Sequence, residues 1–124
     1  MQPEDRIPAN LWDMRDAARE LVAFAAGKTI EDLFSDRMFR MAVERELEIV
    51  GEAARRIPTA FCRAHPEILW SDLIGRRNVL AHDYGAVRLD LLWKAIAVDI
   101  PAIVEPLDNI LVDFEKELAS PCEP

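Results

Sequence analysis

The stretch MFRMAVERELEIVGEAARRI, residues 38–57, decides the fold class of this chain. Its apolar residues recur every three or four positions, which is the spacing of one face of an α-helix. That face consists of Phe39, Val43, Leu47, Val50, Ala54 and Ile57. The opposite face is charged and carries Glu44, Arg45, Glu48, Glu52, Arg55 and Arg56. We therefore predict one amphipathic helix over residues 30–57, which Pro58 ends because its ring cannot continue a helix.

Two further apolar stripes predict long helices before and after this one. The first helix is expected over residues 10–26, with Gly27 as its stop, and its stripe is Leu11, Met14, Ala18, Leu21 and Ala25. The last helix is expected from about residue 88, and Pro101 should kink or split it. Its stripe is Leu89, Leu92, Ile96, Ile100, Ile103, Leu107, Ile110 and Phe114.

The region between the second and last helices predicts two shorter helices. One turn of helix is expected at residues 59–64, closed by His65 and Pro66. Another helix is expected over residues 72–82, because Ser71 is a good N-cap and Asp72 suits the first turn.

No alternating strand pattern is present, and four glycines in 124 residues leave little room for hairpins. Helices joined by short links predict an all-α fold, an antiparallel bundle of four to five helices. We expect one domain over residues 1–124, with a loose tail at 119–124. Trp12, Trp70 and Trp93 are expected in the core and His65 on the surface.

The charge distribution argues against a general nucleic-acid coat or a membrane-surface protein, since the net charge is −8. Residues 55–88 nevertheless contain six arginines against three acidic residues, so this window is +3 and the rest of the chain −11. A cluster of arginines in an otherwise acidic chain suits a local phosphate-binding site. Ordinary solvent-exposed helix faces would give the same charge distribution.

Composition also predicts the compartment and the absence of cofactors. Cys62 and Cys122 lie far apart and show no metal-binding spacing, so we expect free thiols, no metal and no cofactor. No uninterrupted apolar run is long enough to span a bilayer. We therefore expect a soluble, cytoplasmic protein without a membrane partner.

The candidate functional segment is Arg76-Arg77-Asn78-Val79-Leu80-Ala81-His82-Asp83-Tyr84. An imidazole can move a proton near neutral pH, and guanidinium groups bind phosphate. Arg77 and His82 are five residues apart, which is a turn of roughly 140° on a regular helix. The two side chains can therefore meet one phosphate only if the helix loosens near His82, or if two copies of the segment face each other across a dimer.

Such a cleft could cleave RNA without a metal. His82 would move the proton of the ribose 2′-hydroxyl, and Arg77, with Arg76, would stabilise the charge on the phosphorane-like transition state. Asn78 would orient His82 or a phosphate oxygen. The alternative roles are structural: His82 could cap its helix, Tyr84 could pack the helix end, and the arginines could be solvated or could pair with Glu48 or Glu52.

The segment resembles the HEPN superfamily, whose ribonucleases carry Arg-x4–6-His, and in particular the HepT branch, whose motif is Arg-x4-His-x-Tyr. The resemblance extends beyond the motif, to residues 44–53, 70–75, 92–94 and 99–101. It thus covers about residues 11–111 in consistent order, and the motif positions show no departure from the family pattern.

The resemblance implies a homodimeric, metal-independent endoribonuclease with Arg77 and His82 as catalytic residues, supported by Asn78 and Arg76. It implies the toxin of a type VII HEPN/MNT toxin–antitoxin system, acting on tRNA or mRNA. The partner would be an MNT-type nucleotidyltransferase antitoxin that transfers AMP from ATP to Tyr84. Two alternatives stay open: a HEPN module that binds nucleotide or RNA without catalysis, and a structural helical partner protein.

Overall fold

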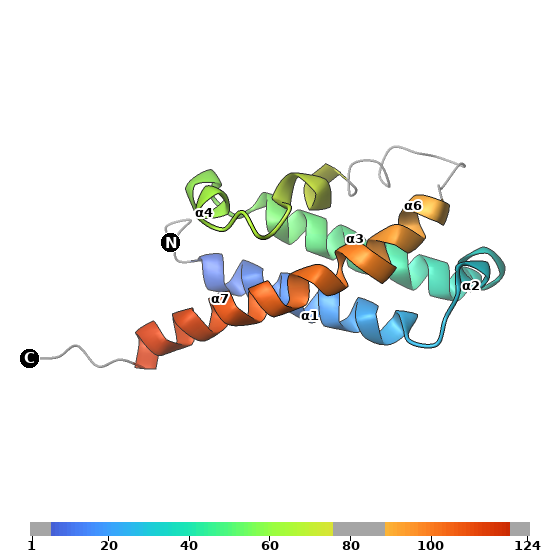
Figure 1. The fold of residues 1–124 in the computed structure, drawn as a ribbon, viewed down its shortest axis with the longest axis horizontal. Helices are drawn as coiled ribbons and strands as arrows, with labels where there is room; N and C mark the ends of the chain where they lie inside the picture. The colour runs from blue at the N-terminus through green and yellow to red at the C-terminus, as the bar shows by residue number, and fades with distance from the viewer. Residues whose placement is uncertain (1–5, 76–88, 120–124) are drawn as a thin grey trace, which may run out of the picture.

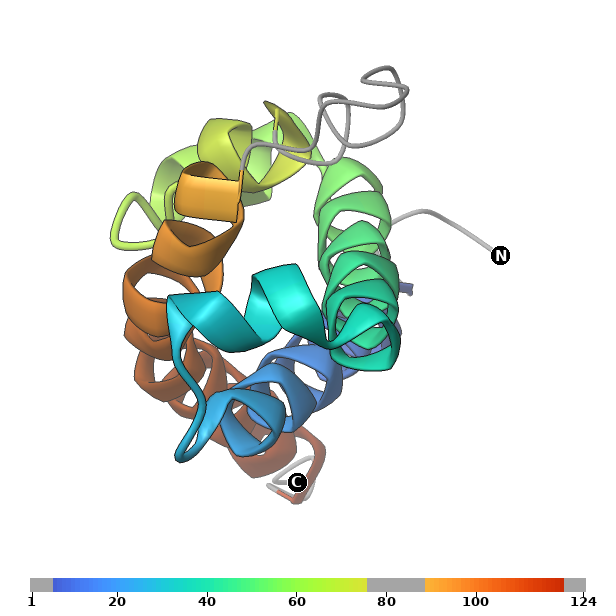
Figure 2. The same cartoon turned by 90° about the vertical axis from the view of Figure 1, so that its right-hand side faces the viewer.

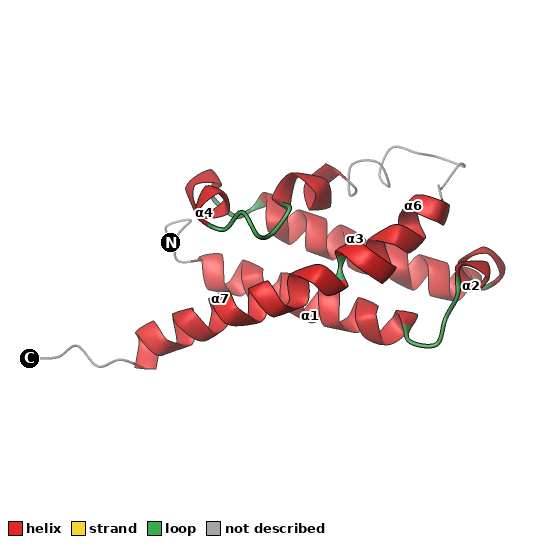
Figure 3. Cartoon of the chain, in the orientation of Figure 1, coloured by secondary structure: helices red, strands yellow, loops and turns green. Residues whose placement is uncertain are grey.

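The computed structural model describes residues 6–75 and 89–119, and within them every regular element is a helix (Figures 1 and 3). The elements are α1 (Ile7–Ala25), α2 (Ile30–Ser35), α3 (Arg37–Arg55), α4 (Thr59–Ala64), α6 (Leu89–Lys94), the π-helical η2 (Ala95–Asp99) and α7 (Pro101–Ala119). Residues 70–75 are also helical. The expected all-α class is confirmed, while the tail at 120–124 lies outside the described residues.

The long helices form an antiparallel bundle. Figure 1 shows α1 and α3 running in opposite directions, and the continuous path from α6 through η2 to α7 runs opposite to α1. Viewed along the bundle, α1 lies between α3 and α7, and residues 70–75 complete the ring between α3 and the α6–η2 segment (Figure 2). The short helices α2 and α4 lie at opposite ends (Figure 1).

The core is built from the three stripes that the sequence indicates. On α1, Leu11, Met14, Ala18 and Leu21 are fully buried. The α3 stripe is buried throughout, and the last stripe is buried from Leu92 to Ile110. Burial of this much apolar area is the main source of stability in a domain of this size, which is expected to be two-state.

The prediction of one helix over residues 30–57 is wrong, because the chain breaks at Asp36. Asp36 has an extended backbone, and its carboxylate accepts a hydrogen bond from Phe39 N–H at 3.1 Å, so it is the N-cap of α3. Arg40 Nη1 donates to the Leu33 and Phe34 carbonyls at 2.9 and 3.3 Å, which satisfies acceptors at the end of α2. Local capping therefore outweighs the helix propensity of the flanking residues.

The predicted disturbance at Pro101 takes the form of a π-helical turn. Proline has no backbone N–H, and its ring crowds the carbonyl four residues earlier. The chain forms a wider turn before Pro101, in which Ile100 N–H donates to the Ala95 carbonyl, five residues back, at 2.8 Å. The helix continues into α7, so α6, η2 and α7 together form one long side of the bundle.

Three smaller expectations need correction. Ser71 is not the N-cap, because helix already begins at residue 70 and the Leu69 carbonyl accepts from Asp72 and Leu73 N–H at 3.1 and 3.2 Å. Trp12 is 38% exposed, whereas Trp70 is buried as expected and Trp93 partly so. His65 is half-buried, because its ring lies 4.4 Å from that of Phe61.

An arginine–aspartate cluster ties α1 to α7. Arg15 is nearly buried; its guanidinium lies 3.7 Å above the Trp12 ring and pairs with Asp108 at 3.3 Å. Arg19 donates to both oxygens of the same carboxylate at 2.9 and 3.0 Å. One acidic side chain on α7 thus holds two cations on α1, which explains how a charged residue sits at the edge of the core.

Within the described ranges, no helix is long and apolar enough to cross a lipid bilayer.

Candidate functional site

The five residues singled out from the sequence, Arg76, Arg77, Asn78, His82 and Tyr84, all lie outside the described residues. The structure describes the two elements that flank them and the outer surface of α3.

The N-terminal flank, residues 70–75, is anchored to the bundle. The buried Trp70 donates its indole N–H to the His65 carbonyl at 3.0 Å. Ile68 and Leu73 are buried in the core, and Ile74 packs against it. These contacts fix where the chain enters the motif segment at residue 76.

The C-terminal flank is anchored as well. In α6, Leu92 is buried, and Leu89 and Trp93 pack against the core. The chain therefore leaves the motif segment at a fixed position on the same bundle, as Figure 1 shows for the end of residues 70–75 and the start of α6. Core contacts therefore position the chain on both sides of the motif segment, at residues 70–75 and in α6.

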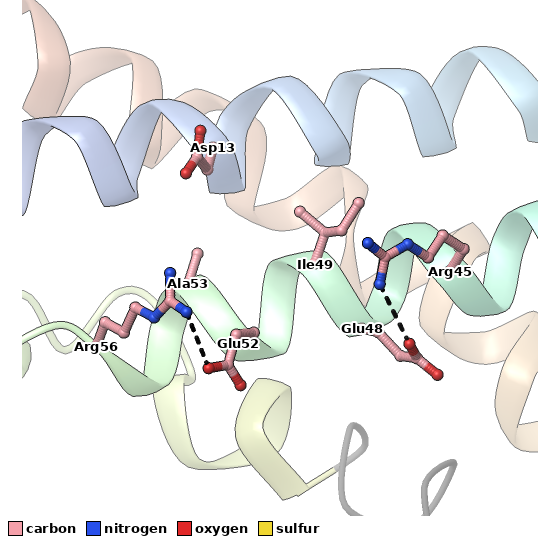
Figure 4. Close-up of a pocket in the computed structure, with 7 residues that line it drawn as sticks. All are labelled: Asp13, Arg45, Glu48, Ile49, Glu52, Ala53 and Arg56. Carbon is pink, nitrogen blue, oxygen red and sulfur yellow. Dashed lines mark ion pairs between the residues drawn. The ribbon is translucent and has the colours of Figure 1, made fainter.

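A polar groove of about 320 Å³ lies on the outer surface of α3, beside α1 (Figure 4). It is lined by Asp13, Arg45, Glu48, Ile49, Glu52, Ala53 and Arg56. In Figure 4, Asp13 comes from α1, Arg56 from the C-cap of α3 and the other five side chains from α3 itself. Its lining combines two apolar side chains, Ile49 and Ala53, with two cations and three carboxylates.

The charged groups of this groove pair along their own helix. Arg45 lies 3.6 Å from Glu48, and both side chains are largely solvent-exposed, at 70% and 44%. Glu52 is 3.4 Å from Arg55 and 3.3 Å from Arg56. The exposed Arg45–Glu48 pair contributes little to folding, because water screens it and both side chains lose conformational entropy. Glu52 is less exposed, at 29% of its side chain, so its pairs are screened less.

Two glutamates on the flanks of α3 have perturbed acidity. Burial raises the pKa of Glu44, against the opposing effect of Arg40. Burial, and then the hydrogen bond and charge of Glu20, raise the pKa of Glu46 to about 7, although Arg45 lowers it. The hydrogen bond between Glu20 and Glu46 joins α1 to α3.

Elsewhere the described side chains show little reactive chemistry. Burial raises the pKa of the free Cys62 thiol, which disfavours a reactive thiolate. Among residues 6–75 and 89–119, no cluster of three or more His, Cys, Asp or Glu side chains could hold a metal ion.

The groove is a feature that the sequence reasoning missed. The charged positions of α3 were recognised as one face, but the pattern within a single helix cannot show that Asp13 and the side of α1 close a hollow beside it. The available signal was the regular spacing of Arg45, Glu48 and Glu52, which places three charged side chains in one line.

Comparison with known proteins identifies the family. A family model described as "Ribonuclease HepT-like" matches residues 14–110, which is most of the chain. The chain belongs to the HepT-like ribonuclease family. The match includes both anchored flanks and the whole motif segment between them.

Individual HepT-like relatives agree with this assignment. The chain is 39% identical to "Probable ribonuclease HepT" of Thermococcus cleftensis, over 75% of this chain and 84% of the relative. It is 33% identical to "Putative RNase MJ1380" of Methanocaldococcus jannaschii, over 84% of this chain and 95% of the relative. No solved structure gives a significant match. The protein is thus a ribonuclease-like, all-α HEPN protein.

Proposed function

We propose that this HepT-like protein is a metal-independent endoribonuclease, with Arg77 and His82 as catalytic residues and Asn78 and Arg76 in support. The observation that carries the proposal is the string Arg77-Asn78-Val79-Leu80-Ala81-His82-Asp83-Tyr84 inside a family match that spans residues 14–110. The anchored flanks support it, because core contacts fix the chain where it enters and leaves the motif segment.

The proposed reaction uses the 2′-hydroxyl of RNA as the nucleophile. His82 acts as general base and takes the 2′-hydroxyl proton while the oxygen attacks the adjacent phosphorus. The bond from phosphorus to the 5′-oxygen breaks, and that oxygen takes up a proton. Arg77 stabilises the negative charge that builds on the non-bridging oxygens. The products are a 2′,3′-cyclic phosphate and a free 5′-hydroxyl, and DNA is not a substrate.

The site is proposed to be composite. Arg77 and His82 cannot point at one phosphate from a single regular helix, because five residues rotate the helix by roughly 140°. Two copies related by a two-fold axis bring one Arg77 and the other copy's His82 to the same phosphate. The tRNA or mRNA substrate then lies in the cleft between the copies.

The biological role proposed is that of a toxin in a type VII HEPN/MNT toxin–antitoxin system. An MNT-type nucleotidyltransferase antitoxin would transfer AMP from ATP to the Tyr84 hydroxyl, releasing pyrophosphate. Each AMP adds bulk and a negative charge two residues from His82, which obstructs and repels RNA. The string that carries Tyr84 supports this part of the proposal.

The test is an RNA digest with the purified protein in EDTA, using tRNA and mRNA. The wild-type protein should cleave, and His82→Ala and Arg77→Ala should each lose at least about 100-fold in rate. Cleavage should weaken steeply with added salt, since a chain of net charge −8 binds RNA only through a local cationic cleft. An Arg37→Ala variant, at an exposed position outside the basic window of residues 55–88, is the matched control and should keep full activity.

Each contrary result would refute a different part of the proposal. Equal cleavage by wild type and His82→Ala would refute the proposed chemistry. RNA binding without any product would indicate the non-catalytic binding module. Intact mass of the protein, purified with and without its antitoxin, tests the AMP transfer: an unchanged mass in both preparations, or AMP still present on Tyr84→Phe, would refute the role of Tyr84.

A further inference from the structure

The groove between α1 and α3 brings both signs of charge together around two apolar side chains (Figure 4). Its volume of about 320 Å³ lies at the lower end of the range for small-molecule sites. Arg45 and Arg56 are eleven residues apart, which is about 16 Å along a helix axis. Ile49 and Ala53 come from the same helix between them, and Asp13 comes from α1 (Figure 4). The groove therefore offers a short apolar surface with hydrogen-bonding groups around it.

Asp13 is the carboxylate of this groove that the described part of the chain leaves unused. Glu48 pairs with Arg45 at 3.6 Å, and Glu52 pairs with Arg56 at 3.3 Å. Asp13 is exposed, and no described residue forms an ion pair or a hydrogen bond with its side chain. Both of its carboxylate oxygens can therefore accept hydrogen bonds from a ligand.

The charges of the groove decide which chemical class can enter it. Three carboxylates stand against two arginines, so an anion at the centre of the groove is disfavoured. A neutral, planar group that both donates and accepts hydrogen bonds can satisfy both signs of charge. Its face can lie against the apolar groups of Ile49 and Ala53. Nucleobases are groups of this kind, and the unpaired bases of RNA are recognised along their edges.

Guanine matches these hydrogen-bonding groups better than the other three bases do. Its N1–H and N2–H₂ donors lie side by side and can donate to both oxygens of one carboxylate. Its O6 and N7 atoms can accept two hydrogen bonds from one arginine. Adenine and cytosine carry an amino group beside a ring acceptor, and uracil has a carbonyl on each side of N3–H. A carboxylate repels those acceptors, so Asp13 favours guanine.

The groove also lies near the chain that leads into the motif segment. Viewed along the bundle, α3 has α1 on one side and residues 70–75 on the other (Figure 2). Residues 70–75 are anchored to the core and lead to residue 76, where the motif segment begins. An RNA strand that reaches the motif segment across α3 can therefore place an unpaired base in the groove.

We propose that the groove between α1 and α3 binds an unpaired guanine of single-stranded RNA. Asp13 accepts from N1–H and N2–H₂, while Arg45 and Arg56 donate to O6, N7 and the phosphate beside the base. The inference deepens the proposed function, on which it rests for the RNA, because it names the base that the substrate presents. The binding itself requires no cleavage. A free guanine nucleotide offers the same groups, so the test compares the two sources.

The test measures binding of the full chain to labelled 2′-O-methyl RNA oligonucleotides, which cannot be cleaved through a 2′-hydroxyl. An oligoadenosine with one guanosine should bind about ten-fold more tightly than oligoadenosine alone, because a bidentate pair discriminates between bases by about this factor. Inosine in place of that guanosine should lose most of the preference, since inosine lacks the N2 amino group. Guanosine 5′-monophosphate should bind more weakly than the guanosine oligonucleotide; tighter binding of the free nucleotide would overturn RNA as the source.

Three variants show whether the groove is responsible. Asp13→Asn keeps the size of the side chain but replaces one acceptor with a donor, so it should abolish the preference for guanosine over adenosine and inosine. Arg45→Ala should weaken binding of the guanosine oligonucleotide. Asp113→Asn makes the same change of charge at an exposed position on α7 and should bind as wild type does.

Two results would overturn the inference. One is a wild-type protein that binds the guanosine, inosine and adenosine oligonucleotides equally. The other is an Asp13→Asn variant, shown to be folded by circular dichroism, that keeps the wild-type preference. The inosine comparison uses the unaltered protein, so it stays decisive if a variant does not fold.

An RNA digest of the same proteins separates the two proposals. A preference for guanine in binding without any cleavage by wild type would uphold the guanine site and refute the ribonuclease. Cleavage of RNA by a protein that binds all the oligonucleotides equally would refute the guanine site and leave the ribonuclease standing.

Discussion

Arg15 and Arg45 each pair with a carboxylate, yet the two pairs occupy opposite kinds of position. Arg15 is nearly buried and reaches from α1 to Asp108 on α7, 93 residues away in sequence. Arg45 is 70% exposed and reaches only one turn along α3, to Glu48. The first pair joins two walls of the bundle, and the second joins a helix to itself.

The contrast teaches which charges maintain the fold and which are available for recognition. Removing one partner of a buried pair leaves a charge in a medium of low polarity, which is costly. Removing one partner of an exposed pair exposes the other to water, which is nearly neutral. The α1–α7 cluster should therefore determine stability, and the exposed Arg45–Glu48 pair on α3 should contribute little to it.

The largest expected effect is that of Asp108→Ala. It leaves Arg15 and Arg19 without their shared carboxylate, and Arg15 cannot reach bulk water because only 11% of its side chain is exposed. We expect a loss of about 2 kcal/mol in the free energy of unfolding, measured by urea denaturation. Asp16 lies 3.4 Å from Arg15 and offsets part of the lost pairing.

Glu48→Ala is the matched control for that comparison, since it removes the carboxylate partner of an exposed arginine. The free energy of unfolding should change by no more than about 0.5 kcal/mol. Equal destabilisation by Asp108→Ala and Glu48→Ala would break the distinction between the two clusters.

A medium effect is expected at the start of α3. Asp36→Ala removes the carboxylate that accepts from Phe39 N–H, and the loss of an N-cap costs about 1 kcal/mol. This change sharpens the comparison, because it shows that α3 is held by its cap and core contacts rather than by its surface ion pairs. Ser35→Ala, one residue earlier, should have the smaller effect in the same thermal melts.

The smallest effect concerns the carboxyl pair between α1 and α3. The pKa of Glu46 is raised to about 7, so the folded protein holds this proton at pH values where the unfolded chain has lost it. The stabilisation that comes from this proton is fully present at pH values below the ordinary pKa of glutamate. It is lost as the pH rises through about 7, the pKa in the folded protein. The melting temperature should therefore fall slightly over that interval.

Glu46→Gln keeps a neutral donor beside Glu20 and should flatten this part of the pH profile. Glu115→Gln, an exposed change on α7, controls for the loss of any carboxylate and should leave the profile unchanged. A wild-type slope in Glu46→Gln would show that the raised pKa of Glu46 does not contribute to the pH profile.

Periodicity was sufficient to predict the core, because residues such as Leu47 and Leu107 recur at helical spacing and every such position faces the same way. It was insufficient at residue 36, since a helix cap depends on one side-chain hydrogen bond rather than on a pattern. It also failed for Trp12, which is 38% exposed and has the Arg15 guanidinium over its ring. Composition alone predicts that a tryptophan ring is buried in the core.

The candidate site also has one part that the sequence predicted and one part that only the structure revealed. Arg77, His82 and Tyr84 were chosen from a motif and from a family resemblance, and the family is now established by comparison. The roles of these residues stay predictions, because they lie outside the part of the chain that the structure describes. The groove on α3 required the structure, since its walls come from two helices that are far apart in sequence.

The most direct test of the central claim, a composite site made by two copies, is a mixing experiment with Arg77→Ala and His82→Ala. Each variant alone should fail to cleave RNA. After the two are mixed and allowed to exchange subunits, each mixed dimer contains one intact Arg77 opposite one intact His82, and cleavage should return. Permanent inactivity of a mixture shown to contain mixed dimers would contradict the account, because it would place both residues of each site in the same copy.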